Sequence, residues 1–282
     1  MASSLRTAAS LVLITPSSHV LFMLRPASGS FPSTHVFPGG VVEPSDPSLS
    51  YTAFRETYEE TGLLLGPRDI TKPVVHAVGE YPSYDSAFKH VFGLETPPKS
   101  DASEPDKSTG TWKSWWTPEN EKSKLDLDRF SNWTTPEHLP KRFATQFYLY
   151  RVPQAFQFPE LPPLSSAPVS IEERAKEPGN GVLGTAREVE KLEWLTPWEA
   201  LTQFQKGKIK LMPPQYYLMN LLFEEGIDKA IEKVHDRVIT PKIVEKLPDG
   251  KVKMDWGRGE FGLIKFGKKN VVDEIEILRT KL

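Results

Sequence analysis

The chain contains no cysteine among its 282 residues. This absence excludes a disulfide framework, thiol catalysis and a structural zinc site built from thiolates. The chain also lacks any apolar run close to the roughly 18 residues that a membrane-spanning helix requires. We therefore expect no membrane partner.

Neither sign of charge dominates the composition. The 35 Lys and Arg residues nearly balance the 37 Asp and Glu residues, and the formal net charge is -2. The basic residues are dispersed, whereas a nucleic-acid-binding protein usually has a basic face, so we expect no nucleic-acid partner. With 38% hydrophobic residues, the chain can bury the core of one enlarged domain, or of one and a half.

The first acidic residue of the chain is Glu43. An acid-poor start is a feature of targeting peptides. Two apolar segments, residues 8–14 and 20–25, instead predict strands of the mature core. The last three residues, Thr280-Lys281-Leu282, are a variant of the Ser-Lys-Leu peroxisomal address or else an ordinary charged tail. The expected location is cytoplasmic or peroxisomal.

Apolar patterns and turn signals predict an α/β (α+β) fold, in which a mixed β-sheet lies between helices. The expected strands are residues 8–14, 20–25, 74–80, 145–152 and 189–194. The expected helices are one that ends just before Gly62, one at residues 197–205 and one at residues 214–225.

Two segments rich in proline interrupt this pattern, residues 97–140 and 153–187. Long loops of this kind often cover a site, so we expect lid and specificity elements here. We expect residues 1–226 to form the main domain with both insertions. Residues 237–282 alternate apolar and polar residues. This pattern predicts that residues 227–282 form a small β-rich C-terminal extension, which either completes the core or forms a homodimer contact.

The helix that ends at Gly62 is acidic on one side. Ser48 or Ser50 can cap its start, and Gly62 is typical of the position just past a helix end. At about 100° per residue, three acids share one sector: Glu56, Glu59 and Glu60. The residues roughly opposite predict the packed face: Phe54, Thr57, Tyr58 and Thr61.

Clustered charges are usually a solvated helix face, but the preceding loop favours a second interpretation. Pro38, Gly39 and Gly40 let the backbone approach a ligand closely, and a glycine carbonyl is a hard oxygen donor that Mg²⁺ accepts beside carboxylates. We therefore predict a divalent-metal site formed by the three acids and the carbonyl of Gly39 or Gly40.

This segment resembles the signature of the Nudix hydrolases. The matching positions are Gly40, Asp46, Arg55, Glu56, Glu59, Glu60, Gly62 and Leu63. Thr57 stands where the family has an aliphatic residue. Eight residues rather than seven separate Asp46 from Arg55, and this expansion resembles the coenzyme A diphosphatase branch. Segments 133–147, 193–201 and 211–217 are similar to its larger peroxisomal members, although the second Arg that normally precedes the signature is missing.

The resemblance implies an enzyme that uses Mg²⁺, with Mn²⁺ as a substitute, to activate water against a small-molecule diphosphate. Coenzyme A or an acyl-coenzyme A, cut to 3',5'-ADP and a phosphopantetheine, is the first expected substrate. ADP-ribose, a dinucleotide, a nucleotide sugar and a prenyl diphosphate are the alternatives. A non-catalytic binding module is an alternative of another class, although such members typically lose signature acids.

Residues outside the signature supply further candidates. The catalytic base is either an acid of the signature or a distant one, for which Glu188 is the candidate, with an ordinary surface residue as the alternative. Arg25, Lys141 and Arg142 are candidates for binding phosphate, or else surface residues in ion pairs. Asp46 is expected to support the loop. Four tryptophans form either a base-stacking platform or anchors of a long loop: Trp112, Trp115, Trp116 and Trp133.

Overall fold

The computed structural model describes most of the chain, in several separate ranges. These are residues 4–28, 31–65, 74–75, 81, 83–92, 116, 125, 127–152 and 189–280. Of residues 74–75 and 90–92 only the backbone is described. The expected insertion at 153–187, the candidate Glu188 and most of the strand expected at 74–80 lie outside these ranges.

An eight-stranded mixed sheet forms the centre of the fold, in the order β10-β7-β8-β1-β2-β3, with β4 on β1 and β9 on β2. The strands are β1 (Leu5–Ile14), β2 (Val20–Leu24), β3 (His35–Val36), β4 (Gly39–Val41), β7 (Leu127–Thr134), β8 (Arg142–Arg151), β9 (Lys191–Leu195) and β10 (Val238–Ile239). The pairs β1–β8 and β7–β10 are parallel, and the other pairs are antiparallel. Sequence-adjacent β5 (Leu63–Leu64) and β6 (Val74–Val75) form a separate pair.

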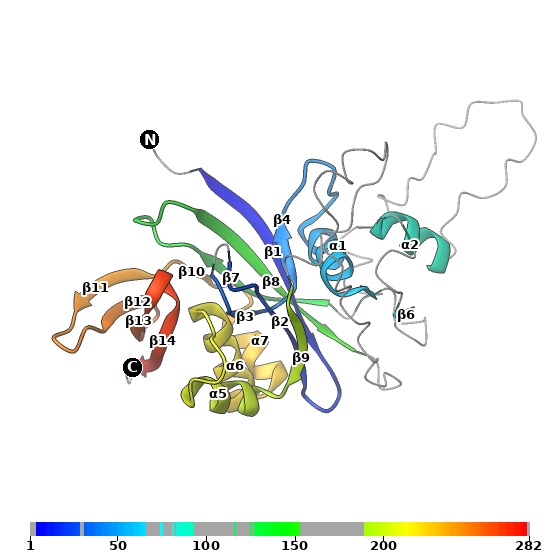
Figure 1. Cartoon of the computed structure of the whole chain (residues 1–282). Coiled ribbons are helices and arrows are strands. Elements are labelled where there is room, and N and C mark those ends of the chain that lie inside the picture. Colours follow the sequence, from blue (N-terminus) through cyan, green and yellow to red (C-terminus); the bar gives the residue numbers. More distant parts are fainter. Residues whose placement is uncertain are drawn as a thin grey trace, which may run out of the picture.

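Helices cover both faces of this sheet (Figure 1). One face carries α1 (Leu49–Thr61), with α2 (Tyr84–Phe92) beside it, and the other carries α5 (Pro197–Gln205), α6 (Pro213–Glu225) and α7 (Ile227–Val234). Successive residues of β1 enter opposite cores, because side chains alternate along a strand. Leu11 and Leu13 pack with α1, and Val12 and Ile14 pack with α5 and α6. The predicted fold class is confirmed.

Local chemistry explains why the helix boundaries agree with those expected. The Ser48 side chain accepts a hydrogen bond from the Tyr51 N–H and caps α1, and Gly62 ends it with φ of 73°. Helix α5 begins with a reciprocal capping box between Thr196 and Glu199. None of the helices in the described ranges has the length and apolarity to cross a membrane.

Several elements were not expected from the sequence, among them the short strands β3, β4 and β5. Strand β7 lies inside the expected insertion 97–140, and its apolar alternation is broken because a bulge between Arg129 and Ser131 turns both Phe130 and Ser131 inward. The short helices α2 and α7 were also missed. In α7 the signal was present, since Ile227, Ala230, Ile231 and Val234 follow helical spacing.

Two of the four tryptophans can be placed, and both are core anchors. Trp116 packs edge-on against Tyr51 and Phe54, with ring centroids 5.3 and 5.4 Å apart. Trp133 packs against Tyr217 at 5.6 Å. The anchoring interpretation is confirmed for these two, whereas Trp112 and Trp115 lie outside the residues that the structure describes.

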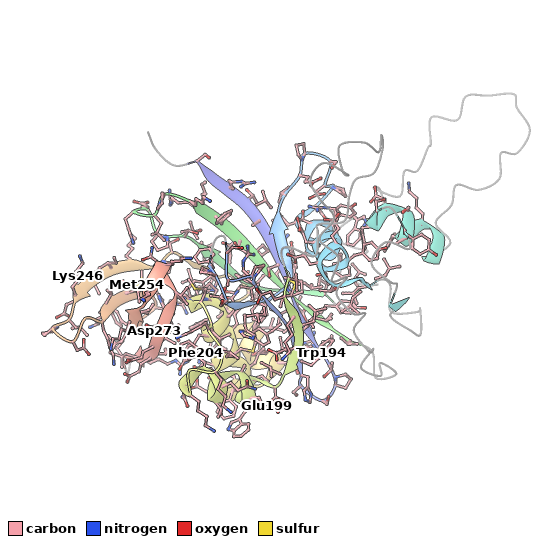
Figure 2. All side chains as sticks on the ribbon, viewed as in Figure 1. Trp194, Glu199, Phe204, Lys246, Met254 and Asp273 are labelled. Carbon is pink, nitrogen blue, oxygen red and sulfur yellow. The ribbon has the colours of Figure 1, made fainter. Side chains whose placement is uncertain are left out.

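The C-terminal region forms a second sheet, an antiparallel meander of β11 (Lys242–Lys246), β12 (Val252–Gly257), β13 (Glu260–Phe266) and β14 (Val272–Arg279). A 3₁₀ turn, η2 (Lys268–Asn270), links the last two strands. The inner face of this second sheet shares one hydrophobic core with the main sheet. Two residues of that core are labelled in Figure 2, Phe204 of α5 and Met254 of β12. Not all residues after 226 belong to this second sheet, since α7 and β10 come first and β10 pairs with β7 of the main sheet. The division of the chain after residue 226 stays a prediction.

A buried ion-pair network ties this second sheet to the main domain. The Glu260 carboxylate of β13 accepts hydrogen bonds from Tyr217 of α6 (2.7 Å), from Arg279 of β14 (3.1 Å) and from Arg237, which precedes β10. Arg237 also donates to the carbonyl oxygens of Trp256 and Gly257, at 2.5 and 2.8 Å. Although burial alone acts in the other direction, these donors hold the pKa of the Glu260 carboxyl below its ordinary value of 4.5.

The Glu260→Gln variant tests this network, because it removes the charge and keeps the size of the side chain. Arg237 is left buried without its counter-ion, so we expect the free energy of unfolding at neutral pH to fall by about 3–5 kcal/mol. Urea denaturation followed by tryptophan fluorescence measures the change. Glu232→Gln, at an exposed position of α7, is the matched control and should unfold like the wild type.

The difference in unfolding free energy between the wild type and Glu260→Gln should depend on pH. Because the folded pKa of Glu260 lies below the unfolded value of 4.5, the unfolded chain binds more protons in acid. The stabilisation is therefore present above pH 4.5 and is lost as the pH falls through the folded pKa. The difference between wild type and Glu260→Gln should shrink over that range, and a constant difference down to about pH 3 would contradict the assignment.

Candidate functional site

The loop before α1 is held rigidly against the central strand. Phe37 is buried between Phe22 and Phe147, with ring centroids 5.1 and 6.1 Å away. The Pro38 carbonyl accepts two hydrogen bonds from β1, from the Leu11 N–H (2.9 Å) and the Ser10 hydroxyl (2.8 Å). The segment that begins the signature therefore has one fixed position.

The two glycines of this loop each make room for a different neighbour. Gly39 has φ of +151°, and a Cβ there would lie 2.4 Å from the Ala9 carbonyl oxygen. At Gly40 a Cβ would lie 2.4 Å from the carboxyl carbon of Glu56. Gly39 lets the loop approach β1, and Gly40 leaves room for a carboxylate of α1.

The ladder between β4 and β1 decides which glycine carbonyl faces the helix. The Leu11–Pro38 and Val42–Thr7 hydrogen bonds mark alternate pairs of this antiparallel ladder. Alternation makes Ala9–Gly40 the hydrogen-bonded pair between them, so the Gly40 backbone points toward β1. The Gly39 backbone points the other way, and its N–H donates to the Glu60 carboxylate at 2.9 Å. Gly39 is therefore the better candidate for a carbonyl ligand.

The acids of α1 lie on the side that faces this loop, as the helical spacing predicts. The opposite side is fully packed, since Phe54, Thr57 and Tyr58 are at most 1% exposed. Glu60 is buried, while the side chains of Glu56 and Glu59 are 18% and 25% exposed. A freely solvated acidic face does not describe this arrangement.

Arg55 is the counter-ion of the acidic cluster. Its guanidinium donates to Asp46 at 3.0 and 3.1 Å and lies 2.8 Å from Glu59 and 3.0 Å from Glu56. Asp46 also accepts from the Glu43 N–H and the Thr52 hydroxyl, at 2.9 and 2.8 Å. Asp46 thus fixes both the loop and Arg55, and the support by Thr52, three residues before Arg55 on the helix, was not anticipated from the sequence.

One guanidinium does not neutralise this many carboxylates in a buried setting. Burial raises the pKa of the Glu56 carboxyl to about 7, although the Arg55 charge acts in the other direction. Burial also raises the pKa of Glu59 above 4.5. The site therefore lacks positive charge, which a bound cation would supply.

The donor types suit a hard divalent cation, but the side chains are not gathered around one point. In the described ranges no group of three or more His, Asp or Glu side chains is arranged to hold a metal. Glu56 and Glu59 contact Arg55, and Glu60 contacts the Gly39 N–H. A metal would need the first two to turn away from Arg55, which their partial exposure allows.

Two of the three candidate phosphate-binding residues lie where β8 begins, away from β4. Lys141 is exposed, and Arg142 at the start of β8 donates to the Thr135 carbonyl at 3.3 Å. Arg142 is opposite Leu5 of β1, whereas β4 pairs further along that strand, roughly 10–16 Å away at about 3.3 Å per residue. Arg25 lies just past β2, where its N–H donates to the Thr34 carbonyl at 2.9 Å. Their binding role stays a prediction.

Comparison with known proteins identifies the family. A model of the NUDIX domain matches residues 4–147. The chain belongs to the Nudix family. The predicted membership of the Nudix hydrolases is thereby confirmed at the level of the family, while the coenzyme A branch stays a prediction.

Two Nudix relatives illustrate the extent of the similarity. The chain is 28% identical over 229 residues to putative nudix hydrolase 7 of Caenorhabditis elegans, covering 78% of this chain and 61% of that protein. It thus spans less than two thirds of that relative's length. The crystal structure of a NUDIX hydrolase from Alicyclobacillus acidocaldarius has a TM-score of 0.50 and 22% identity, over 82% of this chain and 97% of that one. This similarity shows a shared fold.

The Gly39→Ala variant tests the close approach of the loop to β1. A positive φ in this region alone costs about 1–3 kcal/mol for a residue with a side chain, and the clash with the Ala9 backbone adds to it. Gly250→Ala is the matched control, because Gly250 has φ of +82° but open space around its Cβ position. We expect the larger loss of unfolding free energy for Gly39→Ala in urea denaturation. Equal losses would contradict the close approach.

Proposed function

We propose that this protein is a divalent-metal-dependent hydrolase that cleaves a diphosphate bond in a small molecule, with Mg²⁺ as the physiological ion and Mn²⁺ as a substitute. The observation that carries the proposal is the set of buried and half-buried, under-neutralised carboxylates on α1 beside Gly39 and Gly40. Membership of the Nudix family supports the same reaction class.

Glu56, Glu59 and Glu60 would hold the metal together with the Gly39 carbonyl. A bound ion would supply positive charge to neutralise phosphate and would lower the pKa of the attacking water. The raised pKa of Glu56 suits a carboxylate that gains its negative charge as a cation arrives.

Arg55 and Asp46 would keep the site ordered while it exchanges ions. Without a metal, Arg55 neutralises Glu56 and Glu59 in part. Asp46, whose side chain is only 1% exposed, holds the guanidinium in place when the two acids turn to a metal. Glu188 remains the proposed distant base, and a signature acid is the alternative.

The proposed substrate is coenzyme A or an acyl-coenzyme A, which would yield 3',5'-ADP and a phosphopantetheine. The support is the Phe37-Pro38-Gly39-Gly40 turn with eight residues between Asp46 and Arg55. Arg25, Lys141 and Arg142 would bind the phosphates that do not react, since guanidinium and ammonium groups both pair with phosphate. A peroxisomal or cytoplasmic location and a homodimer stay predictions.

Other substrates remain as outcomes of the test. ADP-ribose, a dinucleotide, a nucleotide sugar and a prenyl diphosphate each contain the diphosphate on which the metal acts. A non-catalytic binding module would leave all of these intact. The protein is incubated with each compound and Mg²⁺ in ¹⁸O-labelled water, and the products are identified by mass. Cleavage of ADP-ribose without cleavage of coenzyme A would remove the preferred substrate.

We expect Glu60→Gln to lower kcat on the preferred substrate by about 100-fold or more, because losing a direct ligand costs more than losing a residue that only supports one. Glutamine retains an oxygen that can accept from the Gly39 N–H, so folding should change little. Glu232→Gln is the matched control and should keep full activity. EDTA should abolish turnover, and added Mg²⁺ should restore it. Turnover in EDTA, or by Glu60→Gln at the wild-type rate, would refute the metal site.

A further inference from the structure

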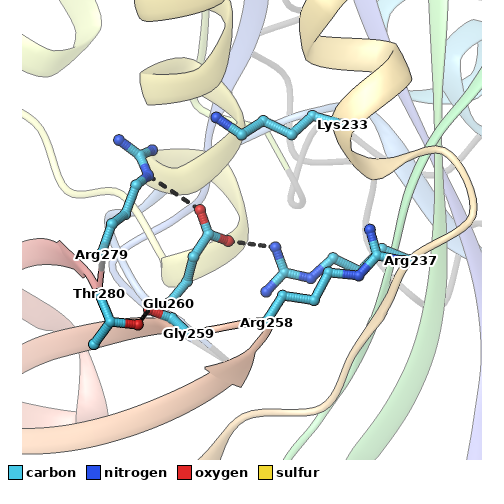
Figure 3. Close-up of a pocket in the computed structure, with 7 residues that line it drawn as sticks. All are labelled: Lys233, Arg237, Arg258, Gly259, Glu260, Arg279 and Thr280. Carbon is cyan, nitrogen blue, oxygen red and sulfur yellow. Dashed lines mark hydrogen bonds and ion pairs between the residues drawn. The ribbon is translucent and has the colours of Figure 1, made fainter. Parts of the chain in front are cut away.

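A pocket of about 210 Å³ lies between α7 and the C-terminal sheet (Figure 3). Its lining is strongly basic and consists of Lys233, Arg237, Arg258, Gly259, Glu260, Arg279 and Thr280. Figure 3 shows Glu260 between Arg237 and Arg279, joined to both. Four cationic side chains therefore surround a single carboxylate.

Most of this charge is already paired. Arg237 and Arg279 share Glu260, Arg279 also contacts Glu224 at 2.7 Å, and Lys233 contacts Glu225 at 2.7 Å. Arg258 is the exception, since its exposed side chain has no hydrogen bond or ion pair with any residue in the described ranges. The charge that remains for a ligand is therefore positive and is centred on Arg258.

The backbone at Arg258 supports a functional interpretation. Arg258 and Gly259 form the two-residue turn between β12 and β13, with φ of 53° and 73°. Such turns favour Asn at the first position, because a left-handed φ is unfavourable for a long side chain. A strained conformation that places an unpaired guanidinium at the lining of a pocket is the kind of outlier that marks a binding residue.

Size and donor geometry indicate the class of ligand. Pockets for drug-sized molecules have volumes of roughly 300–1,000 Å³, so this one suits a small anion or one group of a larger ligand. Lys233 retains N–H donors beyond its bond to Glu225, and Arg258 retains its whole guanidinium fork. Donors from two sides suit the several oxygens of a phosphate better than the two of a carboxylate.

We propose that this pocket binds a phosphate group, either as free inorganic phosphate or as the terminal group of a small phosphorylated molecule. The pocket is separate from the diphosphate site, because α1 packs on one face of β1 while Arg237 and Glu260 join elements packed on the other face. The proposal goes beyond the proposed function, and its failure would leave that function unaffected.

The test is a titration of the full chain with inorganic phosphate in EDTA, at constant ionic strength kept with chloride, followed by calorimetry and thermal unfolding. Arg258→Asn removes the guanidinium and suits the left-handed turn, so the variant should fold at least as well as the wild type. Arg129→Asn, at an exposed position of β7, is the matched control.

We expect saturable 1:1 binding of phosphate, which should raise the melting temperature. When the phosphate concentration is ten times Kd, the folding equilibrium constant should increase by about 11-fold. Arg258→Asn should weaken binding by about tenfold or more, because a charge-assisted contact is lost, and Arg129→Asn should bind like the wild type. A terminal phosphate monoester, tested as AMP, that binds more tightly than inorganic phosphate identifies the phosphorylated molecule as the source, and the reverse order identifies free phosphate.

Three results would overturn the proposal. The first is no saturable phosphate binding, and the second is binding that Arg258→Asn leaves unchanged. The third is acetate binding as tightly as phosphate, which would show a general anion effect.

Discussion

The close approach of Gly39 to β1 is the constraint on which the candidate site depends. With no side chain at this position, the loop lies against Ala9 and Ser10 and directs the Gly39 N–H to Glu60. Gly40 then leaves the space that the Glu56 carboxylate occupies. Two of the three acids thus take their positions from the absence of a Cβ atom.

The protein contains two buried clusters of carboxylates and guanidinium groups with opposite electrostatics. At Glu260, two Arg side chains and a Tyr hydroxyl donate hydrogen bonds to one carboxylate, and its pKa is lowered. At Glu56, one Arg serves several acids, and the pKa is raised to about 7. The ratio of cations to acids decides whether the pKa is raised or lowered, because burial raises it in both clusters.

This contrast separates a structural role from a functional one. The Glu260 carboxylate accepts hydrogen bonds from α6, from β14 and from the residue before β10. This cluster joins the C-terminal sheet to the main domain. A carboxylate saturated with donors stabilises a particular arrangement of elements and has no need of a further cation. The Glu56 cluster is short of positive charge, and this shortage is the reason why we propose a cation there.

Features governed by neighbouring residues could be predicted from the sequence. The cap at Ser48, the end of α1 at Gly62 and the acidic side of the helix follow from contacts within a few residues. Most of the strands that were expected also form, because their apolar residues are contiguous. Strand β7 was missed, because its bulge hides the alternation that identifies a strand.

Long-range contacts decided the rest. The sequence by itself determined the family signature, the direction of its acids and the kind of ligand that they suit. Only the tertiary structure decided that Asp46 holds Arg55, that the backbone N–H of Gly39 rather than that of Gly40 points to the helix, and that Arg237, Glu260 and Arg279 meet in one cluster. Burial and partner geometry arise when distant segments pack together, and no local pattern encodes them.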